Sequence, residues 1–333
     1  STFRGTTNDA VIELSEMLSE FFAPDGATRA FYTSGGSDSV ETALRLSRQY
    51  HKIRGEASRT KFLSLKKGYH GTHFGGASVN GNANFRTQYE PLLPGCHHIP
   101  APYTYRNPFN ESDPAKLAQL CLQALEDEIA FQGANTIAAF IMEPILGAGG
   151  VIPPHASFMP GVAAICRKNG ILLIADEVIT AFGRIGSAFA AQEFEVLPDI
   201  ITTAKALTSG VIPMGAVFVS NEIHETFMKG PENAIELFHG YTYSGHPVAA
   251  AAALACLDIY EKEKLFEHSK AISTHFEDAA HGLANCANVK DVRNYGLMAA
   301  IELNSGPSGV GTRAFDVFNK CFFEKDILVR VTG

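Results

Sequence analysis

Three short, mostly apolar runs, each followed by an ionisable side chain, constrain the fold of this chain more than any other feature. They cover residues 136–142, 171–175 and 200–204, and the side chains that follow them are Glu143, Asp176 and Lys205. Runs of this kind are typical of parallel strands that helices cover on both faces. Helical patterns separate them, so the sequence predicts an α/β fold with a mostly parallel, doubly wound sheet. Ligands of such sheets bind beyond the carboxyl ends of the strands, where these three side chains are expected.

Composition narrows the class of ligand. The 333 residues carry a formal net charge of -8, and 46% of them are hydrophobic and 19% charged. An acidic chain of ordinary globular composition is poorly suited to bind a nucleic acid or an anionic membrane surface. The longest apolar run, residues 248–257, is mostly alanine and far too short to span a bilayer. We therefore expect a small-molecule substrate, with neither nucleic acid nor membrane as a partner.

Cysteine usage and the chain ends bear on location. Six cysteines are scattered singly, without the Cys-x-x-Cys spacing of zinc or redox sites. They predict free thiols in a reducing compartment, and no signal sequence is visible at the start, so we expect a cytoplasmic protein. The chain opens on Ser1, without a methionine, and ends abruptly on Val331-Thr332-Gly333, which leaves open that either end was cut.

A glycine-rich turn before a predicted helix is a candidate anion site. Gly35, Gly36 and Ser37 lie where free backbone N–H groups and the helix dipole favour a phosphate. Asp38 and Glu41 resemble a capping pair that fixes the helix start. A tight turn without a ligand explains the same residues. The segment lacks both the Gly-Lys-Ser/Thr ending of a P-loop and the Gly-x-Ser-x-Gly pattern of a hydrolase elbow.

An aromatic side chain follows another predicted strand. Tyr69 lies between Gly68 and His70-Gly71, and an aromatic at such an exit either caps the core or presents its ring face to something planar. His70 and His73 have a spacing that could serve a metal, but no carboxylate or cysteine lies near them in sequence. We expect no metal here.

These residues together form a chemical set. A lone lysine after a strand is a weak sign, because most lysines are solvated surface charges. Lys205 can form a Schiff base, Asp176 can hold a pyridinium nitrogen protonated, Tyr69 can stack on a ring, and the glycine turn can bind a phosphate. That combination describes pyridoxal 5'-phosphate.

The remaining segments set the domain organisation. Residues 78–113, rich in Asn, Gly, Pro and Tyr, predict a long ordered loop of the kind that borders a site. After about residue 260 the helices become shorter and more charged, so we expect a large domain at 1–260 and part of a smaller α+β domain at 261–333. Other predicted elements are helices at residues 7–22, 40–48, 114–131 and 158–168, and strands at residues 28–33, 61–65, 215–220, 297–302 and 327–330.

The motifs resemble those of one enzyme family, nearly end to end and in the family's order. The matching stretches are residues 31–43, 68–71, 143–150, 172–178, 203–205, 242–247 and 328–330. On these the chain is identified as a member of the class III (ω-amino acid:pyruvate type) aminotransferases, which are fold type I pyridoxal-phosphate enzymes. The resemblance implies a large domain whose central sheet is flanked by helices, and a smaller C-terminal domain.

The resemblance also implies roles for particular residues around the cofactor. Gly36 and Ser37 would bind the phosphate, and Tyr69 and Val178 would pack on opposite faces of the pyridine ring. Lys205 would form the internal aldimine. The remaining expected cofactor contacts are Asp176, which pairs with the ring nitrogen, and Gly35, His70, Glu143 and Thr242. We expect Lys205, Asp176 and Tyr69 to be the catalytic residues.

Substrate and subunit contacts are implied in the same way. Thr242 would reach the phosphate of a neighbouring subunit, so the active site would be completed in a homodimer or a tetramer. Arg330 matches a mobile arginine that holds a substrate carboxylate, and Ala148 would set the size of the small substrate pocket. Where family members have Ser-Gly-Ser, this chain has Gly35-Gly-Ser37, which removes one hydroxyl and keeps the backbone donors.

The expected function is a transaminase that moves an amino group from an ω-amino acid, an amine or an α-amino acid to pyruvate or a similar keto acid. An adjacent carboxylate typically raises the pKa of a cation by about 1 to 3 units, so Asp176 would keep the ring nitrogen charged. Lys205 would be neutral when it takes the substrate proton. A decarboxylase, mutase or racemase of the same fold, and a catalytically silent homologue, are the alternatives.

Overall fold

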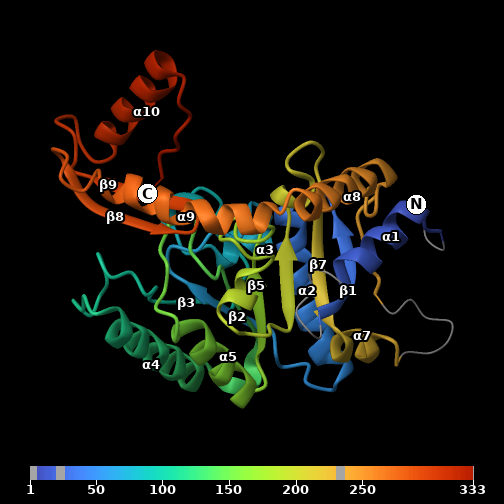
Figure 1. Cartoon of the computed structure of the whole chain (residues 1–333). Coiled ribbons are helices and arrows are strands. Elements are labelled where there is room, and N and C mark those ends of the chain that lie inside the picture. The colour runs from blue at the N-terminus through green and yellow to red at the C-terminus, as the bar shows by residue number, and fades with distance from the viewer. Residues whose placement is uncertain (1–5, 20–26, 230–236, 333) are drawn as a thin grey trace.

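A seven-stranded sheet forms the centre of the molecule in the computed structural model, which describes residues 6–19, 27–229 and 237–332 (Figure 1). The strand order is β1-β7-β6-β5-β4-β2-β3. The pairs β3/β2, β2/β4, β4/β5 and β5/β6 are parallel, and β7 runs antiparallel to both its neighbours. The predicted α/β class with a mostly parallel sheet is confirmed. The strands are β1 (Ala27–Thr33), β2 (Lys61–Leu65), β3 (Cys96–Ile99), β4 (Ile137–Met142), β5 (Leu172–Asp176), β6 (Ile200–Thr203) and β7 (Gly215–Ser220).

The central strands are buried because both their faces are covered. Every residue of β4 and β5 is buried, and from Leu172 to Ala175 successive side chains pack on opposite faces of the sheet. Phe140 and Leu173 pack on one face of the sheet, while Ile141 and Ile174 pack on the other. This explains why the sequence shows unbroken apolar runs here rather than alternation.

Helices lie on both faces. The face that holds Ile141 and Ile174 packs against α2 (Gly36–Ile53) and α7 (Asn221–Phe227). The face that holds Phe140 and Leu173 packs against α1 (Asp9–Met17), α4 (Pro114–Gln132), α5 (Phe158–Lys168) and α8 (Pro247–Lys262). The predicted helix at residues 158–168 is confirmed, and α4 begins where Asp113 caps the N–H of Lys116 at 2.8 Å. The described part of the predicted helix at residues 7–22 is helical from Asp9 to Met17, and residues 20–22 lie outside the described residues.

The helix does start on the glycine turn, but its predicted span and its predicted capping pair were wrong. The helix starts at Gly36 and runs to Ile53, well beyond the predicted residues 40–48. Asp38 is therefore inside the first turn, where it accepts a hydrogen bond from the Ser34 N–H at 3.1 Å. Glu41 accepts one from the Gly75 N–H at 3.1 Å, so the two carboxylates do not form the predicted capping pair.

Two further predictions failed where a strand's partners decide its formation. Residues 78–113 were predicted as one loop, yet they contain the edge strand β3, whose polar His97 and His98 concealed it. Residues 327–330 were predicted as a strand but pair with no strand within the described ranges.

A second, two-stranded antiparallel sheet lies apart from the central one (Figure 1). It consists of β8 (Val289–Tyr295) and β9 (Met298–Leu303), and α9 (Leu265–His281) and α10 (Thr312–Lys325) accompany it. We propose that the smaller domain begins near residue 261, at the junction of α8 and α9. Within the described residues, no helix combines the length and apolarity needed to cross a bilayer.

Candidate active site

A cavity of about 150 Å³ lies at the carboxyl ends of β4, β5 and β6. Eight of the expected site residues line it: Gly36, Ser37, Tyr69, His70, Glu143, Asp176, Val178 and Lys205. They come from separate segments of the chain, and the sheet topology brings them together. The remaining lining residues, which the sequence did not single out, are Val40, Gly71, Ile179 and Ala204.

Asp176, the last residue of β5, is held by several donors. Its side chain is buried and accepts hydrogen bonds from the Thr202 hydroxyl at 3.1 Å and the Val178 N–H at 3.3 Å. His70 Nδ1 lies 2.8 Å from its Oδ2. Thr202 is its register partner on β6, which only the sheet pairing reveals. A buried carboxylate with these partners is fixed in orientation and suited to pair with a cation.

His70 is itself fully buried. Its Nε2 atom has no hydrogen-bond partner within the described ranges, although its Nδ1 is bound to Asp176. An unpaired buried polar atom costs free energy in a folded protein, and this one belongs to a residue that lines the cavity. His73, the other candidate metal ligand, lies 2.6 Å from Asp38 at the surface instead. No group of three His, Cys, Asp or Glu residues gathers as a metal site in the described part of the chain.

Glu143 follows β4 and lies against the same cavity. Its two carboxylate oxygens accept hydrogen bonds from the Tyr69 and Gly147 N–H groups, both at 2.9 Å. Burial raises the pKa of Glu143 to about 7, and the nearby Asp176 charge acts in the same direction. Glu143 therefore ties together the backbones of two segments that border the cavity.

Lys205 begins the short 3-10 turn η4 (Lys205–Thr208), one residue beyond the end of β6. Its φ of 45° is in the left-handed region, which a non-glycine residue seldom adopts. Although its side chain still reaches solvent in the single chain, desolvation lowers the pKa of Lys205 below its ordinary value. Asp176 and Glu143 oppose that shift, and the positive charge of Arg330 adds to it.

The glycine turn brings the start of α2 against the cavity. A Cβ atom added at Gly36 would lie 2.9 Å from Val178 Cγ1, so only glycine leaves this approach open. Gly35, the N-cap of α2, gives the first turn no side-chain hydrogen bond within the described residues. The Ser37 hydroxyl accepts a hydrogen bond from the Thr72 N–H at 3.1 Å. A helix start of this kind binds anions well.

Tyr69 presents its ring at the cavity wall. Its N–H is bound to Glu143, and its ring packs edge-on against Phe85 with centroids 4.8 Å apart. The backbone bond and the ring contact together restrict how the ring can turn. This leaves the ring as the aromatic member of the cavity lining.

The other four expected residues lie outside the lining. Gly35 uses its carbonyl to accept hydrogen bonds from Thr33 and Ser39. Thr242 is exposed in the segment before α8. The Ala148 carbonyl accepts a hydrogen bond from the Thr332 hydroxyl, so the segment that carries Arg330 ends next to it. Arg330 is also exposed, and its positive charge lowers the pKa of Lys205.

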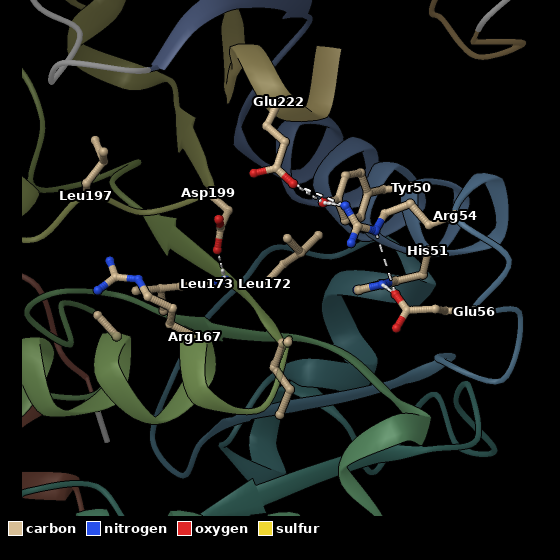
Figure 2. Close-up of a pocket in the computed structure, with 13 residues that line it drawn as sticks. Tyr50, His51, Arg54, Glu56, Arg167, Leu172, Leu173, Leu197, Asp199 and Glu222 are labelled. Atoms are coloured by element: carbon tan, nitrogen blue, oxygen red, sulfur yellow. Dashed lines mark hydrogen bonds and ion pairs between the residues drawn. The ribbon is translucent and has the colours of Figure 1, made fainter. Parts of the chain in front are cut away.

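A larger cavity of about 260 Å³ lies at the amino ends of the strands, where β5 and β6 begin (Figure 2). Glu222 is bound there to both Arg54 and Tyr50, at 3.2 and 2.8 Å. The Asp199 carboxylate accepts a hydrogen bond from the Leu173 N–H at 2.7 Å. None of the expected site residues lines this cavity.

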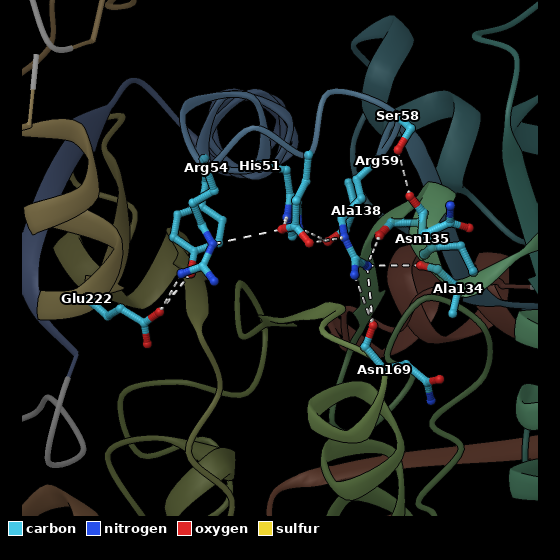
Figure 3. Close-up of polar contacts among 12 residues, drawn as sticks. His51, Arg54, Ser58, Arg59, Ala134, Asn135, Ala138, Asn169 and Glu222 are labelled. Carbon is cyan, nitrogen blue, oxygen red and sulfur yellow. Dashed lines mark hydrogen bonds and ion pairs between the residues drawn. The ribbon is translucent and has the colours of Figure 1, made fainter.

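The same end of the sheet holds a buried arginine that pairs with backbone carbonyls (Figure 3). Arg59 donates to the carbonyls of Ala134, Ile137 and Asn169 at 2.9 to 3.3 Å. Beside it, His51 lies 2.9 Å from the Ala138 carbonyl and 3.2 Å from Glu56. These contacts satisfy carbonyl groups at the ends of secondary-structure elements, which is a structural role.

The family model and the sequence relatives that match this chain are all aminotransferases. The family model of the class-III aminotransferases matches residues 1–321. An omega-aminotransferase of Caulobacter vibrioides is 44% identical over 93% of this chain and 70% of its own length. An omega-amino acid–pyruvate aminotransferase of Pseudomonas putida is 38% identical, over 91% of this chain and 68% of its own.

Solved structures agree with the sequence relatives. An amine transaminase from an uncultivated Pseudomonas species, in its PLP-bound form, superposes with a TM-score of 0.92 at 42% identity. The match covers 99% of this chain and 76% of that one. An (S)-enantioselective omega-transaminase from Thermomicrobium roseum gives a TM-score of 0.91 at 39% identity, over 99% and 74% of the two chains.

Proposed function

We propose a function from one premise: the chain belongs to the class III aminotransferase family. The enzyme transfers an amino group from an ω-amino acid or an amine, or from an α-amino acid, to pyruvate or a similar keto acid. The observation that carries this proposal is that Lys205, Asp176 and Tyr69 line the same cavity. Relatives named for ω-amino acids and pyruvate support the choice of substrates.

The residues present fit pyridoxal 5'-phosphate, the cofactor of this family. The start of α2 has first-turn N–H groups without a side-chain cap in the described residues, which suits the phosphate. The absence of a side chain at Gly36 keeps the approach past Val178 open. Asp176 is an orientated, buried carboxylate for a ring nitrogen, and Tyr69 offers a ring face.

The proposed roles follow from those positions. Gly36 and Ser37 hold the phosphate, while Tyr69 and Val178 flank the ring, and Asp176 keeps its nitrogen protonated. When bound, pyridoxal phosphate takes up the electron pair released as the substrate Cα–H bond breaks. His70 orients Asp176 through its Nδ1 contact, and Glu143 fixes the backbone at Tyr69.

Lys205 is the proposed attachment point and proton carrier. A lysine takes a proton from Cα only when its amine is neutral. Desolvation lowers the pKa of Lys205, which increases the neutral fraction at neutral pH. Its position at the carboxyl end of β6, on the same cavity as Asp176, lets one amine both hold the cofactor and move the proton.

Substrate selection is assigned to residues at the rim. We propose that Arg330 pairs with a substrate carboxylate and that Ala148 limits the small side of the substrate pocket. Their segments are joined by the hydrogen bond from Thr332 to the Ala148 carbonyl. The effect of the Arg330 charge on Lys205 supports a position within reach of the cavity.

Assembly and location complete the proposal. Thr242 is exposed in the single chain and lies outside the cavity lining, which is consistent with a role in a partner's site. We infer a homodimer, or a tetramer built from such dimers, in the cytoplasm.

One experiment tests the function. The purified protein is mixed with pyruvate and β-alanine or a simple amine, and alanine formation is followed beside the cofactor's absorbance near the visible edge. We expect alanine to form, and Lys205→Ala to lose both signals while Lys168→Ala, an exposed lysine, keeps them. Bound cofactor without amino transfer would favour a decarboxylase, mutase or racemase, and no cofactor band would indicate a silent homologue.

A further inference from the structure

A tight turn of five residues follows Glu143 and borders the active-site cavity. Leu146 and Ile152 exchange backbone hydrogen bonds at 2.9 and 3.2 Å, which closes the turn formed by residues 147–151. Gly150 has a φ of 117° and Val151 a φ of 48°. A β-branched residue seldom adopts the left-handed region, so surrounding contacts must hold this turn in place.

The turn is coupled to the cavity at its first residue. The Gly147 N–H donates to Glu143 Oε2 at 2.9 Å. A Cβ atom added at Gly147 would lie 2.5 Å from Ile179 Cδ1, so the turn packs directly against a side chain that lines the cavity. A shift of the turn would therefore move two walls of the cavity.

The contacts that hold the far side of the turn come from the second sheet. Arg293 on β8 is 9% exposed and donates to the Gly150 carbonyl from Nε at 3.0 Å and from Nη2 at 2.8 Å. Its Nε also lies 3.3 Å from the Val151 carbonyl. The guanidinium thus binds the carbonyl of Gly150 and lies within reach of the carbonyl of Val151, the strained residue of the turn.

Other groups fix the guanidinium itself. Asp291 accepts a hydrogen bond from Nη1, and Glu302 lies 3.7 Å from Nη2. The Arg293 guanidinium carbon lies 4.9 Å from the centre of the Tyr103 ring, which belongs to the long loop before α4. A charged, planar donor held on several sides is a rigid support for a carbonyl pair.

We propose that Arg293 is a positioning residue that sets the substrate pocket from outside it. Arg293 fixes the position of the 147–151 turn. That turn contains Ala148 and contacts Glu143 and Ile179, so it fixes their positions too. Thr332, two residues after Arg330, donates to the Ala148 carbonyl of the same turn. Arg293 therefore supports both proposed substrate-selecting groups, Ala148 and Arg330. This inference rests on the proposed transaminase function for its kinetic consequence only.

The first test measures the turn itself and needs no activity. Hydrogen exchange of the amides of Gly150, Val151 and Ile152 is compared between the parent protein and Arg293→Gln, both loaded with cofactor. We expect exchange in the turn to speed up by about tenfold or more, with exchange in β5 unchanged. The matched control is Arg313→Gln, because Arg313 donates only to the carbonyls of Asn304 and Ser305 within the described residues.

The second test separates positioning from stability. For Arg293→Gln we expect KM for pyruvate and for an ω-amino acid to rise by about tenfold, with kcat changed less than about threefold. Arg293→Lys, which keeps the positive charge but lacks the planar fork of donors, should recover part of the loss. A structural anchor alone would lower the melting temperature and leave KM unchanged.

The outcomes are distinct. If the parent protein transfers no amino group, the proposed function fails while the exchange test still decides the role of Arg293. If Arg293→Gln does not fold, Arg293→Lys is measured in its place, with a smaller increase expected in exchange and in KM. Unchanged exchange in the turn, or a rise in KM matched by Arg313→Gln, would overturn the proposal even for an active transaminase.

Discussion

At the scale of single residues, the buried acids around the cavity make stability depend on pH. Glu143 has an ordinary pKa of 4.5, and burial raises the pKa of Glu143 to about 7 in the folded protein. Between these values the folded state binds more protons than the unfolded state. This contribution to stability is therefore full below about pH 4.5 and is lost as pH rises through about 7.

We predict that Glu143→Gln flattens this dependence. The free energy of unfolding in urea, measured from pH 4.5 to pH 7.5, should fall less steeply in the variant, because its amide does not titrate. Some slope remains, since burial also raises the pKa of Glu177 to about 7. Glu225→Gln, at an exposed position, serves as the control and should keep the parent slope. A variant curve parallel to the parent would contradict the assignment.

Residue chemistry was predictable where a side chain follows a strong strand pattern. The sequence predicts Glu143, Asp176 and Lys205 at one edge, and the structure places all three on one cavity. It did not reveal Thr202 or Arg293, because their importance comes from strand register and from contacts between distant segments. Thr202 occupies an ordinary strand position, and Arg293 is one arginine in a modest β8.

At the scale of elements, the start of α2 offers a sharp test of the phosphate assignment. We predict that Gly36→Ala weakens cofactor binding by about tenfold or more, since its Cβ would meet Val178 Cγ1 at 2.9 Å. A fluorescence or absorbance titration of the cofactor-free protein gives the dissociation constant. Val178→Ala added to Gly36→Ala should restore part of the affinity by making room.

Gly35→Ala is the matched control for that experiment. A Cβ at Gly35 meets nothing within 4 Å, and its φ of 166° is extended backbone that any residue adopts. Its cofactor affinity should equal that of the parent. Equal losses in Gly35→Ala and Gly36→Ala would mean that the close approach to Val178 does not matter.

Elements with unbroken apolar runs or clear caps were the ones that sequence could predict. β4 and β5 follow from their buried residues, and α4 from Asp113 and Pro114 at its start. The failures came where the signal was non-local. β3 is visible only through its pairing with β2, and α2 begins at a glycine that carries no capping side chain.

At the scale of the whole molecule, the proposed exchange of Thr242 between subunits can be tested by mixing. In sizing experiments the protein should have about twice the 35.8 kDa mass of one chain, or about four times that mass if the dimers pair into a tetramer. We predict that Lys205→Ala and Thr242→Ala chains, each weak or inactive alone, regain activity when their subunits are exchanged. Random exchange makes about half of the dimers hybrids, each with one complete site. Alanine formation at limiting cofactor measures the recovery.

The control uses two residues that line the cavity of a single chain. A mixture of Lys205→Ala and Asp176→Asn chains creates no complete site, so it should stay inactive. Activity of the first mixture equal to the mean of its components would show that Thr242 does not act across the interface.

The bare start of α2 has a practical consequence for handling the protein. On the proposed assignment, the cofactor's phosphate group serves as the missing cap of an 18-residue helix, so the small molecule becomes part of the secondary structure. Any tetrahedral oxyanion can compete for that place. Reconstitution in phosphate or sulfate buffer should therefore require more cofactor than reconstitution in an amine or zwitterionic buffer at the same ionic strength.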